Sequence, residues 1–486
     1  MEQLSGQDAM FLYTETRDSP MHVAGLAIYD QSTAPGGQVR FKDILRHAQE
    51  RLHTSRSFRH KLVTVPFSLD HPYWIEDPDF DLEFHVRHIA LPEPGDWRQL
   101  CIQVARIHAR PLDLNRPLWE MYVIGGLDNV PDRPPGSYGI FTKIHHAAID
   151  GASGAELTAA LHDLTPDARV PAPDTRWEGE QEPSAVELMV RTAFNNVRQP
   201  FRLARVVADA VPAIARVTRG LRSEELTRSG PVPKTRFNAR VSPHRVVEGR
   251  SFSLDEVRAI KKTLVGATVN DVILTVCGGA LRAYLEEKRE LPEDSLIAMA
   301  PVNVRSKDEE GTEGNQVSQM SIPIRSDVAD PTERLHAVRE GSRASKELTN
   351  AIGARLMTDF SKHIPASLAA LGSKAALRLG LVNRMDPLFN CTITNVPGPQ
   401  VPLYMGGARL VTNYGLGPVI DGMGLIICVL SYCGTITVTA TSCRQMMPDP
   451  EFFSECLQAS FDELKEAALG AEPQVLAEAP EEAPSA

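Results

Sequence analysis

One short stretch, KIHHAAIDGAS, constrains the local fold more than any other part of the chain. The run that leads into it, YGIFTKIHH (138–146), is rich in aromatic and β-branched side chains, which predicts a strand. Ser153 and Glu156 follow at the S-x-x-E spacing of a capping box, which predicts a helix that runs to about Leu164. The two histidines and Asp150 therefore lie on a predicted strand-to-helix turn, where two rigid elements would hold them.

This turn carries two imidazoles and a carboxylate, in the order His145, His146 and Asp150. A neutral imidazole, whose ordinary pKa is about 6.5, can accept a proton at cellular pH, so His146 could act as a general base. Asp150 could fix the imidazole tautomer or, if it is turned away, lock the loop through an arginine. Gly151 allows a backbone geometry that a Cβ atom would obstruct. The residues alone leave three alternatives open: a base, a metal ligand and a structural pair.

Motifs of several other protein classes are missing from the sequence. A metal site would need a third ligand, and no HExxH or comparable pattern is present. There is no G-x-S-x-G of a serine hydrolase and no G-x-x-x-x-G-K-[ST] of a nucleotide hydrolase. The formal net charge of −11 argues against nucleic acid as a partner, because phosphate binding needs clustered positive charge.

Length and composition predict a folded chain with two domains. The 486 residues are 42% hydrophobic and 23% charged, and the seven cysteines show no CxxC or zinc spacing, which favours a reducing compartment. The start, MEQLSGQDAMFLY, lacks the pattern of a signal peptide. The most apolar run, residues 424–434, is too short to span a bilayer. We therefore expect a cytoplasmic protein that is not secreted and has no transmembrane helix.

Shifts in composition divide the chain into four parts. Thr268 with Asp271 predicts a capped helix in the third part. Both large parts alternate strands and helices, which predicts a cleft between two similar α/β domains, where sites tend to lie. The parts are an N-terminal domain at 1–170, a linker with a basic amphipathic segment at 171–234, a C-terminal domain at 235–470 and a disordered tail rich in Ala, Pro and Glu at 471–486.

The basic segment, residues 190–222, differs from the acidic remainder of the chain. It holds seven arginines and one acid, which gives it a net charge of +6. Basic amphipathic helices bind at membrane interfaces, so we expect peripheral membrane association through this segment. The alternative is an interdomain helix with a solvated basic face. An apolar stripe at helical spacing is formed by Val190, Phe194, Val197 and Phe201, and Pro200 and Pro212 interrupt the helix.

An ordered set of short motifs resembles one known family. HHAAIDG (145–151) is similar to the HHxxxDG motif of CoA-dependent acyltransferases, which peptide-synthetase condensation domains share. More narrowly, the whole chain resembles the bacterial wax ester synthase/diacylglycerol acyltransferase family. The resemblance rests on LSGQDAMFLYTETRDSPMHVAGLAIYD, PLDLNRPLWEMYVIGGL (111–127), HHAAIDG, the ND pair in TVNDVIL (268–274), PVNVRS (301–306), GNQVSQMSIPI and NVPGP (395–399).

The resemblance implies a fold and a reaction. The fold is α/β, with two chloramphenicol-acetyltransferase-like domains and the active site in the cleft between them. The reaction is transfer of a fatty acyl group from acyl-CoA to diacylglycerol, or to a long-chain alcohol to make a wax ester. Acyl-CoA is then a co-substrate, and no bound cofactor or metal is expected. Both substrates partition into membranes or lipid droplets, and the basic segment would bind the protein to that surface.

The resemblance also implies roles for the residues of the turn. His146 is the general base that takes the proton of the acceptor hydroxyl, whose oxygen then attacks the thioester without an acyl-enzyme intermediate. His145 is expected to support loop geometry or substrate placement. Asp150 is expected to be mainly structural, with Arg305 as its partner, and Gly151 to set the loop geometry.

Residues of the second half complete the expected site. Asn270 matches the ND motif and could donate a hydrogen bond near the histidine or the developing oxyanion, worth about 2.7–4 kcal/mol in a dry site. The alternative is that Asn270 and Asp271 are simply favoured in the first turn of a helix. The composition of Asn395, Pro397 and Gly398 predicts a turn that borders the cleft.

Two other functions stay open from the sequence. One is a condensation-type or polyketide-associated acyltransferase, which would depend on a carrier protein instead of free acyl-CoA. The other is a non-catalytic lipid-surface protein that keeps the fold. The intact HHxxxDG argues against the second alternative, because a binding protein needs no base.

Overall fold

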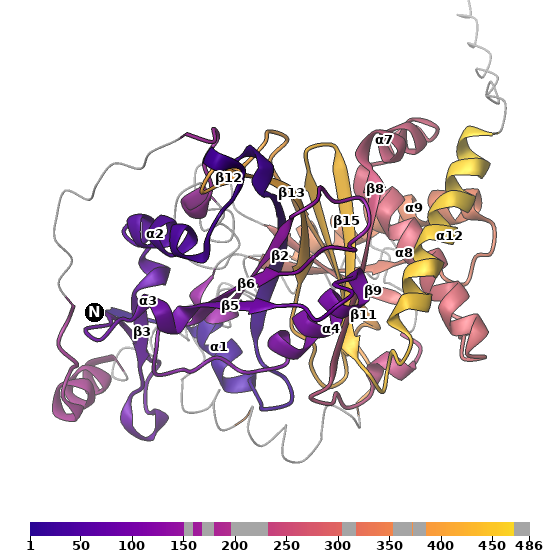
Figure 1. Ribbon diagram of the computed structural model, residues 1–486. Coiled ribbons are helices and arrows are strands. Elements are labelled where there is room, and N and C mark those ends of the chain that lie inside the picture. The colour runs from indigo at the N-terminus through magenta and orange to yellow at the C-terminus, as the bar shows by residue number, and fades with distance from the viewer. Residues whose placement is uncertain are drawn as a thin grey trace, which may run out of the picture.

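The computed structural model describes residues 1–149, 159–167, 179–195, 232–303, 317–352, 372 and 385–470. Within these ranges the chain forms a mixed α/β structure with two six-stranded sheets and one three-stranded sheet (Figure 1). The helices are α1 (Gly6–Thr14), α2 (Phe41–Arg51), α3 (Leu82–His85), α4 (Trp97–His108), α7 (Leu254–Lys262), α8 (Val269–Glu287), α9 (Pro331–Ile352) and α12 (Pro450–Leu469), with short 3-10 turns η1 (Gln31–Thr33), η2 (Pro35–Gly37), η3 (Arg56–Phe58), η4 (Pro66–Ser68), η5 (His146–Ala148) and η6 (Arg236–Asn238).

The first six-stranded sheet carries the histidine pair at the end of one of its central strands. Its order is β12-β13-β2-β7-β6-β5, and all neighbours are antiparallel except β5 and β6. In the register of β2 and β7, His22 lies opposite His145. The strands are β2 (His22–Asp30), β5 (Val86–Ala90), β6 (Trp119–Gly125), β7 (Tyr138–His145), β12 (Tyr404–Met405) and β13 (Ala408–Leu416).

The second six-stranded sheet lies between the first sheet and a layer of helices. Its order is β10-β9-β11-β14-β15-β8. Figure 1 shows α7, α8, α9 and α12 on the side of this sheet that faces away from the first half of the chain. The strands are β8 (Arg245–Ser253), β9 (Ile297–Asn303), β10 (Val317–Pro323), β11 (Cys391–Pro397), β14 (Leu425–Tyr432) and β15 (Thr435–Cys443).

Helix α8 forms the centre of this second core. Its first turn is closed by the capping box predicted from the spacing of Thr268 and Asp271. Most of its side chains are buried, which is typical of a helix enclosed on all sides. A Cβ atom at Gly278 would lie 2.0 Å from the backbone oxygen of Ile324, so only glycine allows this close approach.

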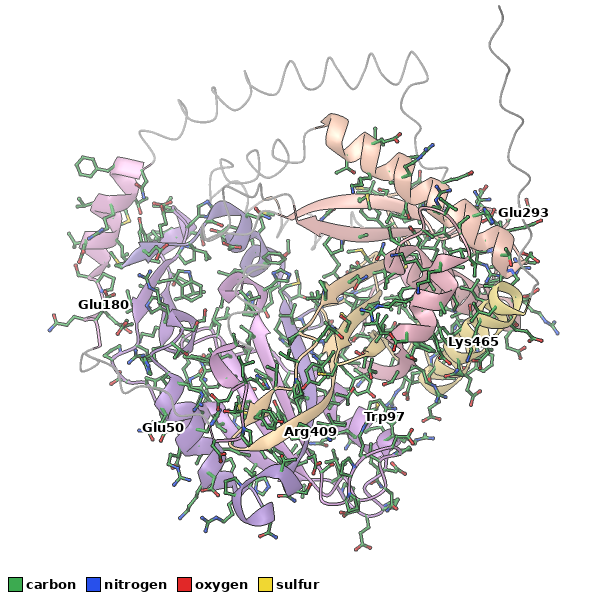
Figure 2. The ribbon with its side chains drawn as sticks, turned by 90° about the horizontal axis from the view of Figure 1, so that it is seen from above. Glu50, Trp97, Glu180, Glu293, Arg409 and Lys465 are labelled. Carbon is green, nitrogen blue, oxygen red and sulfur yellow. The ribbon has the colours of Figure 1, made fainter. Side chains whose placement is uncertain are left out.

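The two halves share strands and side-chain contacts. Strands β12 and β13 come from beyond residue 400 but extend the sheet formed by the first 145 residues. Trp97, labelled at the junction in Figure 2, donates from Nε1 to Oε1 of Glu248 at 2.5 Å. Arg133 donates to the hydroxyl of Tyr414 on β13 at 3.0 Å. The domain boundaries at residues 170 and 234 stay predictions, and the tail from 471 lies outside the described residues.

A small sheet packs beside the histidine pair. It has the order β1-β4-β3, with β1 (Glu2–Gln3), β3 (His60–Val63) and β4 (Tyr73–Glu76). Leu62 and Trp74 lie opposite each other in register and contribute to an apolar cluster with Ala9 of α1. Their neighbours Val63 and Tyr73 contribute to a second cluster with Leu188. Because alternate residues point to opposite faces of a strand, α1 and residues 185–195 cover the two faces of this sheet.

One predicted turn is a strand. Asn395 and Pro397 belong to β11, which pairs in parallel with β14 over residues 392–397. Only Gly398 lies beyond the strand, where its backbone N–H donates to Oγ of Ser431 at 3.2 Å. The sheet pairing outweighs the turn preference of these residues. In the part of the chain that the structure describes, no helix combines the length and apolarity needed to cross a bilayer.

Candidate active site

The backbone of the histidine pair is held by two neighbouring segments. Strand β7 confirms the predicted strand and ends at His145, and the η5 turn begins at His146. The backbone N–H of His145 donates to the oxygen of Leu118 at 2.9 Å, and that of His146 donates to the oxygen of Met21 at 2.8 Å. Asp150, Gly151 and the Ser153–Glu156 capping box lie outside the described residues.

His145 is fully buried, and both of its ring nitrogens face protein groups. Nδ1 accepts the backbone N–H of Ala147 at 3.0 Å, so the neutral ring carries its hydrogen on Nε2. Nε2 lies 3.4 Å from Oε2 of Glu15, which is within ion-pair range but long for a hydrogen bond. These contacts agree with the supporting role that the sequence suggests for His145.

His146 is stacked against a phenyl ring. Its centroid lies 3.8 Å from that of Phe11, and the two planes differ by 13°. Nδ1 is buried and has no hydrogen-bond partner on another residue that the structure describes. Burial lowers the pKa of His146 to about 4, the residue's own backbone opposes this shift, and the nearby His145 adds to it. The imidazole is therefore neutral at cellular pH, which is the state that can accept a proton.

Phe11 lies in α1 and Glu15 directly follows the last residue of this helix, which packs against the η5 turn. The helix begins with a cap in which Oγ of Ser5 accepts the N–H of Asp8 at 3.1 Å. Ala9 is buried in the same cluster as Ala147. Phe11 and Glu15 were not predicted from the sequence, although they are four residues apart, the spacing of neighbours on one helix face. That spacing, within the motif LSGQDAMFLYTE, was the signal that could have found them.

A buried lysine anchors the strand that leads to the histidines. Nζ of Lys143 donates to the backbone oxygen of Arg110 at 2.7 Å and lies 3.2 Å from Oε2 of Glu120. Burial lowers the pKa of Lys143, and the charge of Glu120 opposes this shift. Removing Glu120 would leave the buried ammonium group of Lys143 without its carboxylate partner. This ion pair therefore ties β7 to β6 and to the segment after α4.

The ND pair of the second half divides into two roles. Oδ2 of Asp271 accepts the backbone N–H of Thr268 at 2.8 Å, and the N–H of Asp271 donates to Oγ1 of Thr268 at 3.1 Å. Asp271 is thus a capping residue. Asn270 is left outside the cap, and its Oδ1 accepts from Nδ2 of Asn395 at 3.2 Å. Arg305 lies outside the described residues, so its pairing with Asp150 stays a prediction.

Comparisons with solved structures identify the class of fold. The wax ester synthase/diacylglycerol acyltransferase from Marinobacter aquaeolei VT8 superposes with a TM-score of 0.67 at 26% identity, covering 96% of this chain and 100% of that one. A starter condensation domain of rhizomide synthetase, solved with C8-CoA, gives a TM-score of 0.54 at 15% identity over 96% and 95% of the two chains. The expected two-domain α/β fold of acyltransferases and condensation domains is confirmed.

Sequence comparisons identify the family within this class. The wax ester synthase/diacylglycerol acyltransferase catalytic domain matches residues 4–273, and the WS/DGAT C-terminal domain matches residues 313–465. A Mycobacterium tuberculosis protein named "Probable diacyglycerol O-acyltransferase" is 32% identical over 480 residues, 96% of this chain and 99% of its own. The chain therefore belongs to the wax ester synthase/diacylglycerol acyltransferase family, and it is an acyltransferase.

Proposed function

We propose that this chain transfers a fatty acyl group from acyl-CoA to the hydroxyl of diacylglycerol, with long-chain alcohols as a second class of acceptor. The observation that carries the proposal is the neutral imidazole of His146, stacked on Phe11 at the end of β7 inside the HHxxxDG motif. Because Nδ1 is buried, we assign the role of the base to Nε2. The family match and the named activity of the M. tuberculosis relative support the same substrates.

The reaction needs one base and no covalent intermediate. Nε2 of His146 takes the proton of the acceptor hydroxyl while its oxygen attacks the thioester carbonyl. The new C–O bond forms an ester as the C–S bond breaks, and the departing CoA thiolate receives the proton from the imidazolium. Asn270 is the candidate donor to the oxyanion, at the first turn of α8. Asp150, Arg305 and Gly151 keep their proposed structural roles.

Acyl-CoA is the proposed donor, and no resident cofactor or metal is required. The starter condensation domain with the same fold was solved with C8-CoA, which supports a CoA thioester in this class of protein. The described residues contain no group of three or more His, Cys, Asp or Glu side chains placed to hold a metal ion. His146 alone supplies the proton transfer in this proposal.

The acceptor lipid suggests a protein that works at a lipid surface. Residues 185–195 are helical and dock through Leu188, which is buried against Val65 and Tyr73. Val190 is 52% exposed and Phe194 is 69% exposed on this helix. These two residues begin the stripe predicted for residues 190–222, whose remainder from 196 lies outside the described residues. They support peripheral binding to a membrane or lipid droplet, with a cytoplasmic location still a prediction.

A neighbouring turn adds to this apolar surface. Phe67 is 90% exposed in the η4 turn, which directly follows Val65 of the cluster that binds Leu188. Its φ of +57° lies in the left-handed region, which a bulky side chain rarely adopts. A large aromatic held outward at a conformational cost fits a residue that enters a lipid surface.

The test of the reaction is CoA thiol release from palmitoyl-CoA by the purified protein. Diacylglycerol, hexadecanol and no acceptor are compared, and the lipid products are identified. We expect release that depends on an acceptor and falls by about 10²- to 10⁴-fold in His146→Ala, the range for loss of a general base. An active His146→Ala protein would reject the base assignment.

The same assay separates the two other functions. The protein would belong to the carrier-protein-dependent class if it released no thiol with either acceptor but was active when a phosphopantetheine arm carried the acyl group. Silence with every donor and acceptor, together with retained binding to lipid vesicles, would indicate a non-catalytic lipid-surface protein.

The test of lipid association is flotation with vesicles that contain anionic phospholipid. Replacing Arg198, Arg202 and Arg205 together by Glu should weaken flotation, because the net charge of the basic segment falls from +6 to zero. Phe67→Ser with Phe194→Ser should weaken it through loss of apolar insertion. Val265→Ser is the matched control, since Val265 is 85% exposed and lies in the other half of the chain, between α7 and α8. Unchanged flotation of both variants would favour the solvated interdomain helix.

A further inference from the structure

Two side chains, one in α1 and one directly after it, contact two adjacent histidines. Phe11 stacks on His146, and Glu15, four residues later, faces Nε2 of His145. Glu15 also accepts the backbone N–H of Met21 at 3.2 Å, and the oxygen of Met21 in turn accepts the N–H of His146 at 2.8 Å. These contacts therefore connect Phe11 and Glu15 to both histidines, directly and through Met21.

We propose that Phe11 and Glu15 are positioning residues, and that α1 fixes the orientation of the His146 ring and excludes water from one of its faces. This inference rests on the proposed role of His146 as the base, and it concerns residues that the motif HHxxxDG does not contain. Neither side chain is proposed to exchange a proton with the substrate.

The geometry explains how Phe11 would act. With planes 13° apart and centroids at 3.8 Å, the phenyl ring covers one face of the imidazole. Rotation of the imidazole about its Cβ–Cγ bond would drive its edge into the phenyl ring, so the ring is held with Nδ1 in its buried position. A base held in one orientation needs no reorganisation before the hydroxyl arrives.

Glu15 acts on the other member of the pair. His145 has the tautomer that points a hydrogen from Nε2 to the carboxylate, because its Nδ1 already accepts from Ala147. The carboxylate therefore holds two groups next to the base. One is the ring of His145, and the other is Met21, whose backbone oxygen accepts the N–H of His146. Glutamine has a single acceptor oxygen and could keep one of the two contacts, whereas alanine would lose both.

The titratable groups near the pair are few among the described residues. Glu15 faces it from the end of α1, His22 lies opposite His145 on β2, and Lys143 lies two residues earlier on β7. The pKa of His22 is lowered well below its ordinary value, first by burial. A change at Phe11 alters none of these charges, so its effect on titration comes from water entering beside His146.

The first experiment is the pH profile of kcat/KM for Phe11→Ala. Losing the phenyl ring hydrates the imidazole, so the pKa of His146 should rise from about 4 toward its ordinary value of about 6.5. Since the base works only when neutral, activity should be lost at a higher pH on acidification, with the acidic limb moved up by about one unit or more. At pH 7.5 kcat should fall by about 10- to 100-fold, with a smaller change in KM for palmitoyl-CoA.

Conservative variants and a matched control separate positioning from packing. Phe11→Tyr keeps the stacked ring and should retain the wild-type profile, while Phe11→Leu keeps apolar volume without the flat ring and should fall between Tyr and Ala. Leu12→Ala removes apolar volume from the neighbouring cluster and should lower stability without moving the acidic limb. Glu15→Gln keeps one acceptor oxygen and should lose less activity than Glu15→Ala, which keeps none.

The outcomes distinguish this inference from the assignment of the base. An inactive His146→Ala protein together with an unshifted profile in Phe11→Ala and Phe11→Leu would overturn the role of Phe11 alone. A raised KM with an unshifted pH profile would indicate that Phe11 contacts the acyl chain, and it would likewise overturn the role of Phe11 as a positioning residue. An active His146→Ala protein would overturn the base assignment itself. If Phe11→Ala does not fold, the Leu and Tyr pair decides the question.

Discussion

The two helices that carry candidate site residues hold them in different ways. On the first half of the chain, Phe11 of α1 stacks on His146. Glu15, directly after α1, contacts His145 and accepts the backbone N–H of Met21. On the second half, α8 presents Asn270 through one exposed hydrogen bond to Asn395. The base is thus fixed before any substrate binds, whereas the amide group on α8 can exchange its protein partner for a substrate at small cost.

This difference suggests that substitutions in the two halves affect stability and activity differently. A buried group that loses its partner pays the full desolvation cost, while an exposed group regains water. Substitutions around α1 should therefore reduce stability and activity together. Substitutions at the start of α8 should separate the two, because Asp271 belongs to the helix cap and Asn270 does not.

The largest effect after loss of the base itself is expected for His145→Ala. The substitution leaves the N–H of Ala147 and the carboxylate of Glu15 without their partner in a buried site, which should cost about 2–5 kcal/mol of unfolding free energy. Activity of the folded fraction should fall by about 10- to 100-fold, less than for His146→Ala, because the base remains but its turn is loosened. Chemical denaturation and initial rates measure the two effects.

A conservative change at the same position provides the control. His145→Asn can still accept the N–H of Ala147 through its side-chain oxygen, so it should recover part of both losses. Equal loss of activity in His145→Ala and His146→Ala, with stability unchanged in the former, would mean that His145 takes part in the chemistry.

A smaller effect is expected for Asn270. If its amide donates to the oxyanion, Asn270→Ala should lower kcat by about 10²-fold or more, and if it only pairs with Asn395 the loss should be under about tenfold. Asn270→Asp keeps the acceptor oxygen that faces Asn395 but removes the donor. We expect both variants to lose kcat together by at least about tenfold, with little change in unfolding temperature.

Comparison with Asn395→Ala sharpens this prediction. That variant removes the protein partner and leaves the Asn270 amide in place, so it should keep most of the activity. Wild-type kcat in Asn270→Asp would show that the donor is not used, and the α8 side would then contribute only helix capping.

Local patterns were sufficient to place several site residues from the sequence. The aromatic and β-branched run at 138–146 predicted the strand that ends at the histidines, because these residues fit a pleated surface. The spacing of Thr268 and Asp271 predicted the start of α8, because a capping box acts over three residues. Both signals are local, so a single sequence contains them completely.

Contacts between distant segments could not be predicted in the same way. Alternation of apolar residues indicates that β13 is a half-buried strand, but it does not reveal which sheet receives it, and the strand crosses to the first half. The stacking of Phe11 on His146 joins residues 135 positions apart, and no local pattern links them. The predicted turn at residues 395–398 failed because parallel pairing with β14 outweighed its local composition.

The smallest effect on activity is expected for Asp271→Ala. The carboxylate of Asp271 accepts from both the N–H and the hydroxyl of Thr268, so its loss breaks one half of the capping box. Caps of this kind are worth about 0.5–2 kcal/mol, which corresponds to a drop of about 2–4 °C in Tm per kcal/mol for a large domain. Since α8 is anchored by its buried length, Asn270 should keep its place and kcat should stay within about threefold of wild type. A kcat loss above tenfold with an unchanged Tm would assign Asp271 to the chemistry and remove the distinction between the two residues of the ND pair.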